Sequence, residues 1–323
     1  MKMRRAMLAL AALLLDSTTA WTTVPRSVIT TTPPAIIPHG GAAMMPTAIP
    51  PEIVTSFVPP LACMFLRYDY IVSYGYGGAL ALTGIVLHAV APLQSAILTL
   101  YGVRLCLFLL ARNLFSQRMQ EMQQRIEAKA LARNSDDTSW LQRKLKLLPL
   151  AVSCGYLYYG LSAPLLLQST TNVATQICAA GTALGFAIAA LGDTTKSWVK
   201  RNDPDALVTS GIYSVLRHPN YTGEIIGWTM NCAAGVAGAI HGNLRRGALA
   251  WYMTSSVLGW LGIVFVLMQA TGGLEQRQKE KYGDRAEYKE WIDKTWSGWM
   301  VAKKETPPVI KVSDTVEEGG TGI

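Results

Sequence analysis

The stretch GIYSVLRHPNYTGE at residues 211–224 runs directly into the apolar sequence IIGW at 225–228, and the interpretation of the whole chain depends on it. It joins a dense set of polar side chains to a segment that contains no Asp, Glu, Lys or Arg up to residue 244. Polar groups that enter lipid without a partner carry a high free-energy cost. We therefore expect these side chains to bind a ligand, or one another, at the mouth of a membrane helix.

Hydrophobic residues make up half of the 323 positions, and the charges cluster between long apolar segments. A bilayer core needs about 20 apolar residues per helix. The pattern predicts an all-α, polytopic membrane bundle of about six transmembrane helices, at 71–91, 93–113, 148–167, 172–192, 223–243 and 248–270. The segment 53–66 is apolar but short, and we expect Pro59-Pro60 to break it into a partial or re-entrant helix.

The net charge of +8 indicates a lipid bilayer as partner and not nucleic acid, because the basic residues lie between the predicted spans. The loop 114–147 holds seven Lys and Arg against four acidic residues. The exception is Arg245-Arg246, which falls on the opposite side of the membrane if the spans run as three hairpins. The four His and five Cys show no ligand spacing, so no metal site is predicted.

Residues 1–20 have the pattern of a signal peptide, with a basic start, an apolar middle and small residues at the end. Residues 21–51 resemble a transit peptide, since they are rich in Thr, Pro and Ala and lack acidic residues up to 51. This combination favours a plastid membrane, and the alternative is a secretory signal with retention in the endoplasmic reticulum. The membrane domain is then 52–304, and 305–323 is expected to be disordered.

A helix is expected to begin at Pro219, because the first helical position does not need an N–H group. Asn220, Glu224 and Trp228 then follow at intervals of four and share one face. Gly223 and Gly227 form a Gly-x-x-x-Gly motif on a neighbouring face, where another helix can approach closely. The same close packing is expected at Gly181-x-x-x-Gly185.

Arg217 and His218 lie just before this helix, whose N-terminal dipole favours anions. Lys196 and Lys200 are four residues apart on an extension of the span that ends near 192, so they share a face. Together these cations favour a phosphate-bearing ligand. The alternative is that Arg217 and His218 are anchors at headgroup level and that the two lysines meet solvent.

The segment after 274 is charged and amphipathic. Glu275 and Lys279 support a helix at i and i+4, and Gly283 can end it. The aromatic residues that follow suit either a helix lying on the membrane or an element that closes a pocket.

These motifs together resemble one family. RHPNYTGE at 217–224, TSGIY at 209–213, the segment 193–200 and the tail after 274 are similar to the membrane reductases with a steroid 5-alpha-reductase C-terminal domain, specifically the DUF1295 branch. The segment 98–113 looks like the first half of that branch. The Arg-His-Pro element is also shared with isoprenylcysteine carboxyl methyltransferases and phospholipid methyltransferases, whereas Asn220 together with Glu224 favours the reductases.

The resemblance implies an NADPH pocket built largely from the C-terminal half, at about 172–300. Glu224 and Asn220 match the pair that grips the nicotinamide end, and they are the catalytic candidates. The predicted cofactor-binding residues are Asp193, Lys196, Lys200, Arg217, His218, Asn220, Tyr221, Glu224, Arg277 and Tyr288. The catalytic acid of the family, a Tyr assisted by a Glu in the N-terminal half, has no clear match here, although Tyr68, Tyr70, Tyr74, Tyr76 and Tyr101 are available.

Three functions remain open from the sequence. The first is an NAD(P)H-dependent oxidoreductase that acts on a CH–CH group, reducing an activated C=C bond in a lipid, steroid-like or isoprenoid-like small molecule. The second is a membrane methyltransferase that uses S-adenosylmethionine, a cofactor without phosphates. The third is a membrane scaffold or transporter. No Gly-x-Gly-x-x-Gly motif joins a strand to a helix, so a Rossmann site is excluded. The oligomeric state is not indicated.

Overall fold

The computed structural model describes residues 49–132, 139–168 and 172–298, and these residues belong to one compact unit that begins at Ile49. The predicted signal peptide, nearly all of the transit-like segment and the C-terminal tail lie outside the described residues. The described residues contain no strand, and the predicted all-α class is confirmed. Their helices are α2 (Pro51–Leu66), α3 (Tyr68–Val72), α4 (Tyr74–Val86), α5 (Pro92–Phe115), α6 (Gln117–Ala132), α7 (Trp140–Leu145), α8 (Leu148–Leu166), α9 (Val173–Asn202), α10 (Pro219–His241), α11 (Arg246–Tyr282) and α12 (Ala286–Lys294), with a 3-10 turn η2 (Gly211–Ser214) before α10.

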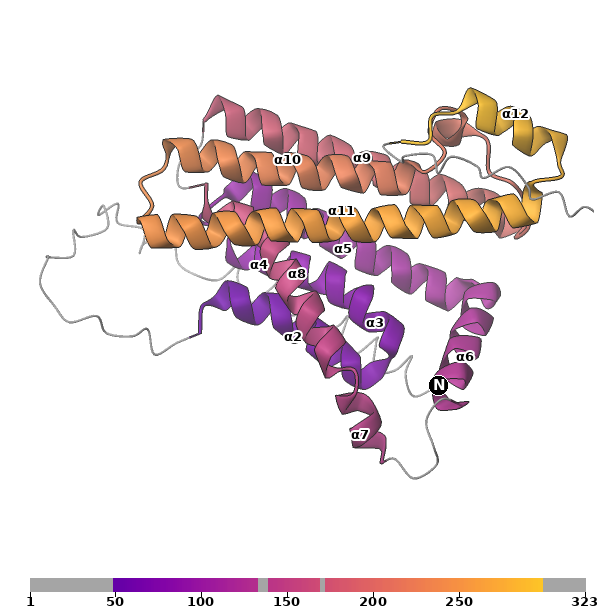
Figure 1. Ribbon diagram of the computed structural model, residues 1–323, viewed down its shortest axis with the longest axis horizontal. Coiled ribbons are helices and arrows are strands. Elements are labelled where there is room, and N and C mark those ends of the chain that lie inside the picture. The colour runs from indigo at the N-terminus through magenta and orange to yellow at the C-terminus, as the bar shows by residue number, and fades with distance from the viewer. Residues whose placement is uncertain (1–48, 133–138, 169–171, 299–323) are drawn as a thin grey trace, which may run out of the picture. The chain divides into compact units, whose positions relative to one another are not determined.

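The long apolar helices indicate an integral membrane protein, and α10 runs alongside both α9 and α11 (Figure 1). In the described part of the chain, α5, α9 and α11 are long and apolar enough to cross a membrane. Helices α8 and α10 occupy the predicted spans at 148–167 and 223–243 and pack against the others. Without a water-driven force between helices in lipid, such a bundle is held by close packing and buried hydrogen bonds.

Two predictions about the N-terminal half are wrong. Residues 71–91 do not form one span, because the helix is interrupted at Ser73 and α4 ends at Val86. The segment at 53–66 is short, as predicted, but α2 runs through Pro59-Pro60 without breaking. The physical reason is tertiary packing. Pro60 lies directly against Gly75 of α4, where a Cβ would meet the Pro60 Cα at 3.0 Å, so contact with α4 offsets the cost of the internal prolines.

Helices α9 and α10 form the closest packing in the site region (Figure 1). A Cβ placed on Gly185 would lie 2.3 Å from the Gly227 backbone nitrogen, and one on Gly223 would lie 2.4 Å from the Ala189 nitrogen. Both distances are shorter than real Cβ contacts, so the two backbones can approach this closely only because residues 185 and 223 are glycines. The predicted Gly-x-x-x-Gly contact is confirmed. It holds the first turns of α10 close against α9.

The C-terminal segment packs onto the entrance to α10. The Trp291 indole N–H of α12 donates to the Tyr213 carbonyl at 2.7 Å. The Arg217 N–H donates to the Trp296 carbonyl, and the Trp296 N–H donates to the Val215 carbonyl, both at 3.0 Å. As predicted, α10 begins at Pro219 and α11 ends just before Gly283. Helix α12 therefore holds the segment that carries Arg217 in place.

Candidate functional site

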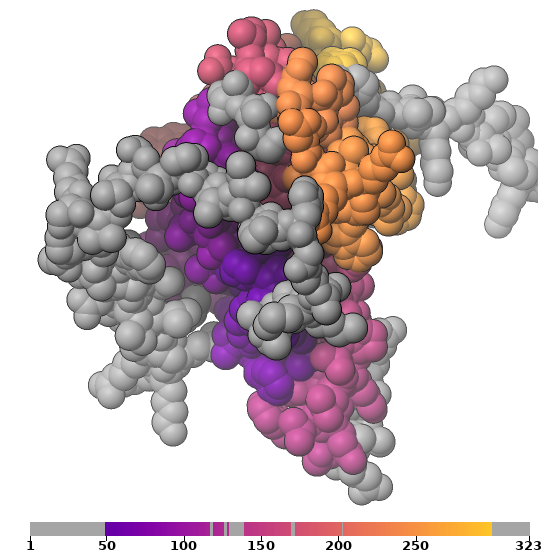
Figure 2. Space-filling model, turned by 90° about the vertical axis from the view of Figure 1, so that its left-hand side faces the viewer, coloured from indigo at the N-terminus to yellow at the C-terminus, as the bar shows by residue number. Residues whose placement is uncertain are grey.

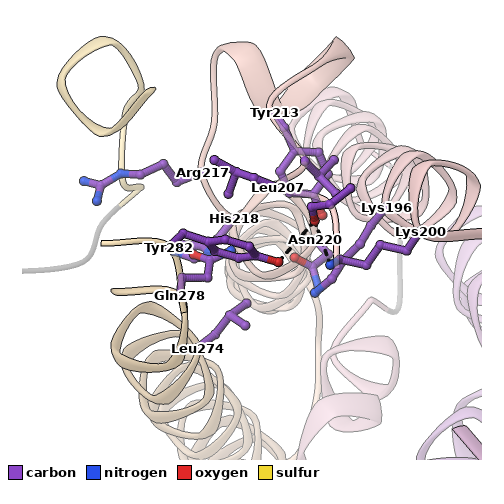
Figure 3. Close-up of a pocket in the computed structure, with 12 residues that line it drawn as sticks. Lys196, Lys200, Leu207, Tyr213, Arg217, His218, Asn220, Leu274, Gln278 and Tyr282 are labelled. Carbon is purple, nitrogen blue, oxygen red and sulfur yellow. Dashed lines mark hydrogen bonds between the residues drawn. The ribbon is translucent and has the colours of Figure 1, made fainter. Parts of the chain in front are cut away.

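A pocket of about 320 Å³ lies between the ends of α9, α10 and α11 (Figure 3). One side of the pocket is closed by residues 206–208, a segment that we call the strap, and another side by Gln278 and Tyr282 of α11. This volume includes space that is open to solvent. Five of the predicted cofactor-binding residues line it, namely Lys196, Lys200, Arg217, His218 and Asn220. The expected proximity of the lysines to Arg217 is thus found.

The two lysines have different roles in the structure. Helix α9 continues to Asn202, as predicted, and carries both side chains into the pocket. The Lys200 ammonium donates to the Pro204 carbonyl at 3.3 Å and to the Ala206 carbonyl at 2.9 Å, so it fastens the strap. The half-buried side chain of Lys196 makes no hydrogen bond or ion pair with the residues that the structure describes. Lys196 is therefore the cation most available to an anionic ligand.

Arg217 and His218 share one carboxylate. The Arg217 Nη1 lies 3.0 Å from the Glu275 Oε1 of α11, and the His218 Nε2 lies 3.1 Å from the same oxygen. Figure 3 shows the Arg217 guanidinium pointing away from the two lysines. His218 is fully buried, and its Nδ1 has no partner in the described part of the chain. Arg217 thus ties α10 to α11 through an ion pair, and its contact with a phosphate stays a prediction.

Glu224 lies one helical turn after Asn220 and faces the interior of the bundle. The Tyr76 hydroxyl donates to the Glu224 Oε2 at 3.3 Å, and the Trp228 indole N–H donates to the Tyr76 oxygen at 2.8 Å. The Tyr101 hydroxyl of α5 also lies close enough to the Glu224 carboxyl group to interact with it. Two of the five tyrosines left open by the sequence are thus brought to Glu224, from α4 and α5.

Aromatic rings enclose this cluster. Tyr101 stacks on Phe186 with 4.0 Å between ring centroids, and Phe186 meets Trp228 edge-on at 5.0 Å. Tyr76, Tyr101 and Trp228 are all buried. A carboxyl group with two phenol hydroxyls in such a dry place is an arrangement suited to holding and transferring a proton.

Two arginines of α5 complete the region, and the sequence reasoning did not assign them. The Arg104 Nη1 pairs with the Asp193 Oδ2 at 2.9 Å, and its Nη2 donates to the Ala190 carbonyl at 3.0 Å. The Arg112 Nε is buried and lacks a hydrogen-bond partner among the described residues. The Arg112 guanidinium lies within electrostatic range of Asp193 and Lys196. Both arginines fall in or at the end of a predicted span, where charges mark functional sites.

The remaining predicted residues lie around the pocket. Tyr221 is half-buried and lies within electrostatic reach of Arg277 and Asp193. Arg277 is exposed on α11, and its positive charge lies within electrostatic range of the Lys196 ammonium. Tyr288 does not line the pocket, because α12 holds it in a small core with Tyr282 and Trp291. Burial raises the pKa of Tyr288, so its hydroxyl stays neutral at physiological pH.

Fold and site together define an α-helical membrane protein with a cationic pocket next to a buried tyrosine–carboxyl cluster. The chain belongs to the DUF1295 family, described as a protein of unknown function, whose model matches residues 74–295. This confirms the DUF1295 part of the resemblance seen in the sequence motifs. Comparison with the curated proteins and with the solved structures gives no match in either case.

Proposed function

We propose that this protein is a membrane-embedded NAD(P)H-dependent reductase of an activated C=C bond in a hydrophobic substrate, of lipid, steroid-like or isoprenoid-like class. One observation carries the proposal. Asn220 lines the cationic pocket, and Glu224, one turn further along α10, belongs to the buried cluster with Tyr76 and Tyr101. A pocket lined by cations and a buried tyrosine–carboxyl cluster are therefore adjacent along a single helix, and this supports phosphate binding at the first and proton donation at the second.

The donors around the pocket fit a dinucleotide with phosphates. Lys196 has no competing carboxylate bond among the described residues, and the buried His218 Nδ1 and Arg112 Nε lack partners there. Cationic donors such as Lys196 and Arg112 recognise phosphate oxygens. We assign Lys196, His218 and Arg112 to the phosphates and Asn220 to the nicotinamide amide. When bound, the cofactor supplies the hydride.

The protein's own part is to polarise the substrate and supply the proton. With substrate bound, the hydroxyl of Tyr76 or Tyr101 would donate its one proton to a carbonyl conjugated with the C=C bond in place of the Glu224 carboxylate, which favours addition at the far carbon. Glu224 orients these hydroxyls, and the indole of Trp228 fixes the Tyr76 oxygen from the other side. Because the enclosure is dry, the developing charge is stabilised by these fixed donors and not by water. A hydrophobic substrate would reach the cluster from the bilayer.

A thermal-shift titration of the full-length protein in detergent with NADPH, NADH and S-adenosylmethionine tests the proposal. A ligand that binds only the native state adds about 2.7 kcal/mol of stability at a hundred times its dissociation constant. We expect NADPH to raise the midpoint for the wild type and for Lys289→Ala, an exposed lysine on α12, and to lose most of this effect in Lys196→Ala. A shift with S-adenosylmethionine alone would favour the methyltransferase, and no shift with any ligand would leave a scaffold or transporter.

A further inference from the structure

The short helix α7 and the end of α2 form an exposed surface that is both apolar and basic, and it lies away from the pocket. We define this α7 surface by Phe65, Trp140, Leu141, Arg143 and Lys146. In Figure 1, α7 extends α8 beyond α2, and in Figure 2 the segment around it projects at the lower end of the view. Nothing in the proposed reductase chemistry uses it.

The α7 surface is rigidly built. A capping box begins α7, since the Gln142 N–H donates to the Ser139 hydroxyl and the Ser139 N–H donates to the Gln142 side chain. The Lys144 ammonium donates to the Leu66 carbonyl at 3.0 Å, which ties α7 to the last turn of α2. The Trp140 ring lies 6.3 Å from the Phe65 ring. The aromatic groups are therefore held in place against α2.

The apolar members of this surface face outward, and none of the residues that the structure describes covers them. The exposed fractions are 55% for Trp140, 50% for Leu141 and 43% for Phe65. Leu148, the first residue of the membrane helix α8, is also exposed. Because the surface continues directly into α8, these groups lie at the boundary of the hydrocarbon region, where tryptophan rings are favoured.

The charge of the α7 surface is one-sided. The side chains of Arg143 and Lys146 make no hydrogen bond or ion pair within the described residues, and no acidic residue occurs between Asp137 and Asp193. Basic side chains beside an apolar, interfacial helix attract anionic headgroups, with an effect of about fivefold in affinity per cation near the surface. The occupant that complements both the charge and the aromatic groups is a phospholipid with an anionic headgroup.

We propose that the α7 surface is a binding site for anionic phospholipid, with Arg143 and Lys146 contacting the headgroup and Trp140 at the level of the upper acyl chain. This site is independent of the proposed catalytic function. Its ligand would be a lipid that anchors this end of the bundle and not a substrate, since the pocket lies at the ends of α9, α10 and α11.

Quenching of Trp140 by brominated lipids tests this site. The full-length protein is reconstituted with brominated phosphatidylglycerol or brominated phosphatidylcholine, and the signal of Trp140 is obtained by subtracting the Trp140→Phe variant. We expect the anionic lipid to be favoured at Trp140 by about fivefold or more in the wild type, and the preference to fall toward unity in Arg143→Gln/Lys146→Gln.

The matched control is Arg245→Gln/Arg246→Gln, which removes the same charge from two exposed residues before and at the start of α11. These residues lie at the other end of α8, because Gly238 of the preceding α10 packs on Gln168. The control should keep the preference of the wild type. Equal quenching of the wild type by both lipids, no quenching by either, or a preference that survives in Arg143→Gln/Lys146→Gln would overturn the proposal.

Discussion

The contact between α9 and α10 gives the most quantitative prediction, through Gly185→Ala. The new methyl group would lie 2.3 Å from the Gly227 nitrogen and 2.6 Å from the Gly223 carbonyl oxygen. Both are backbone atoms that cannot rotate away, so the helices must separate. Overpacking of this kind costs about 1–3 kcal/mol. The substitution also gains up to about 1 kcal/mol, because alanine favours a helix more than glycine does.

The control Gly272→Ala isolates the packing cost. Gly272 lies in α11, and a Cβ there would meet nothing within 4 Å, so only the gain in helix propensity applies. That gain is common to both variants, and the difference between them is therefore the overpacking cost of about 1–3 kcal/mol. At roughly 2–4 °C per kcal/mol, thermal unfolding in detergent should place Gly185→Ala several degrees below Gly272→Ala. Equal midpoints for the two variants would refute the close backbone contact.

Three further predictions concern single contacts. Trp228→Phe removes the indole donor to Tyr76 and should lower the free energy of unfolding by about 1 kcal/mol, measured by chemical denaturation; an unchanged value would show that this hydrogen bond has no net effect. Trp291→Phe leaves the Tyr213 carbonyl without its donor, at a cost of about 1–3 kcal/mol, and hydrogen exchange should rise first in 286–294; exchange that rises uniformly would contradict local docking of α12. Glu275→Gln removes the charge between α10 and α11 and should lower the unfolding midpoint, whereas an unchanged midpoint would mean that the ion pair contributes nothing.

Local chemistry made part of the site predictable. The beginning of α10 follows from Pro219, because a proline costs nothing at the first helical position. The contact between α9 and α10 follows from the spacing of Gly223 and Gly227, since only glycine lets two backbones meet. The position of Lys196 near the pocket follows from helical periodicity once α9 continues past 192.

Contacts between distant parts of the chain were not predictable. Tyr76 meets Glu224 across 148 positions, and five tyrosines in the N-terminal half were equivalent before the fold was known. The pairing of Arg217 with Glu275 depends on where α11 passes α10, which no local pattern encodes. The continuity of α2 through Pro59-Pro60 has the same origin, because packing on α4 overrides the local preference of proline.

The most direct test of the central claim is the equilibrium binding of NADPH to the purified full-length protein, followed by the emission of the reduced nicotinamide. The account predicts a saturable change in emission as the ring leaves water for the enclosure near Asn220 and Glu224, with affinity greatly weakened in Lys196→Ala and preserved in Lys289→Ala. No saturable change with a protein shown to be folded, or equal affinity in Lys196→Ala and the wild type, would contradict it.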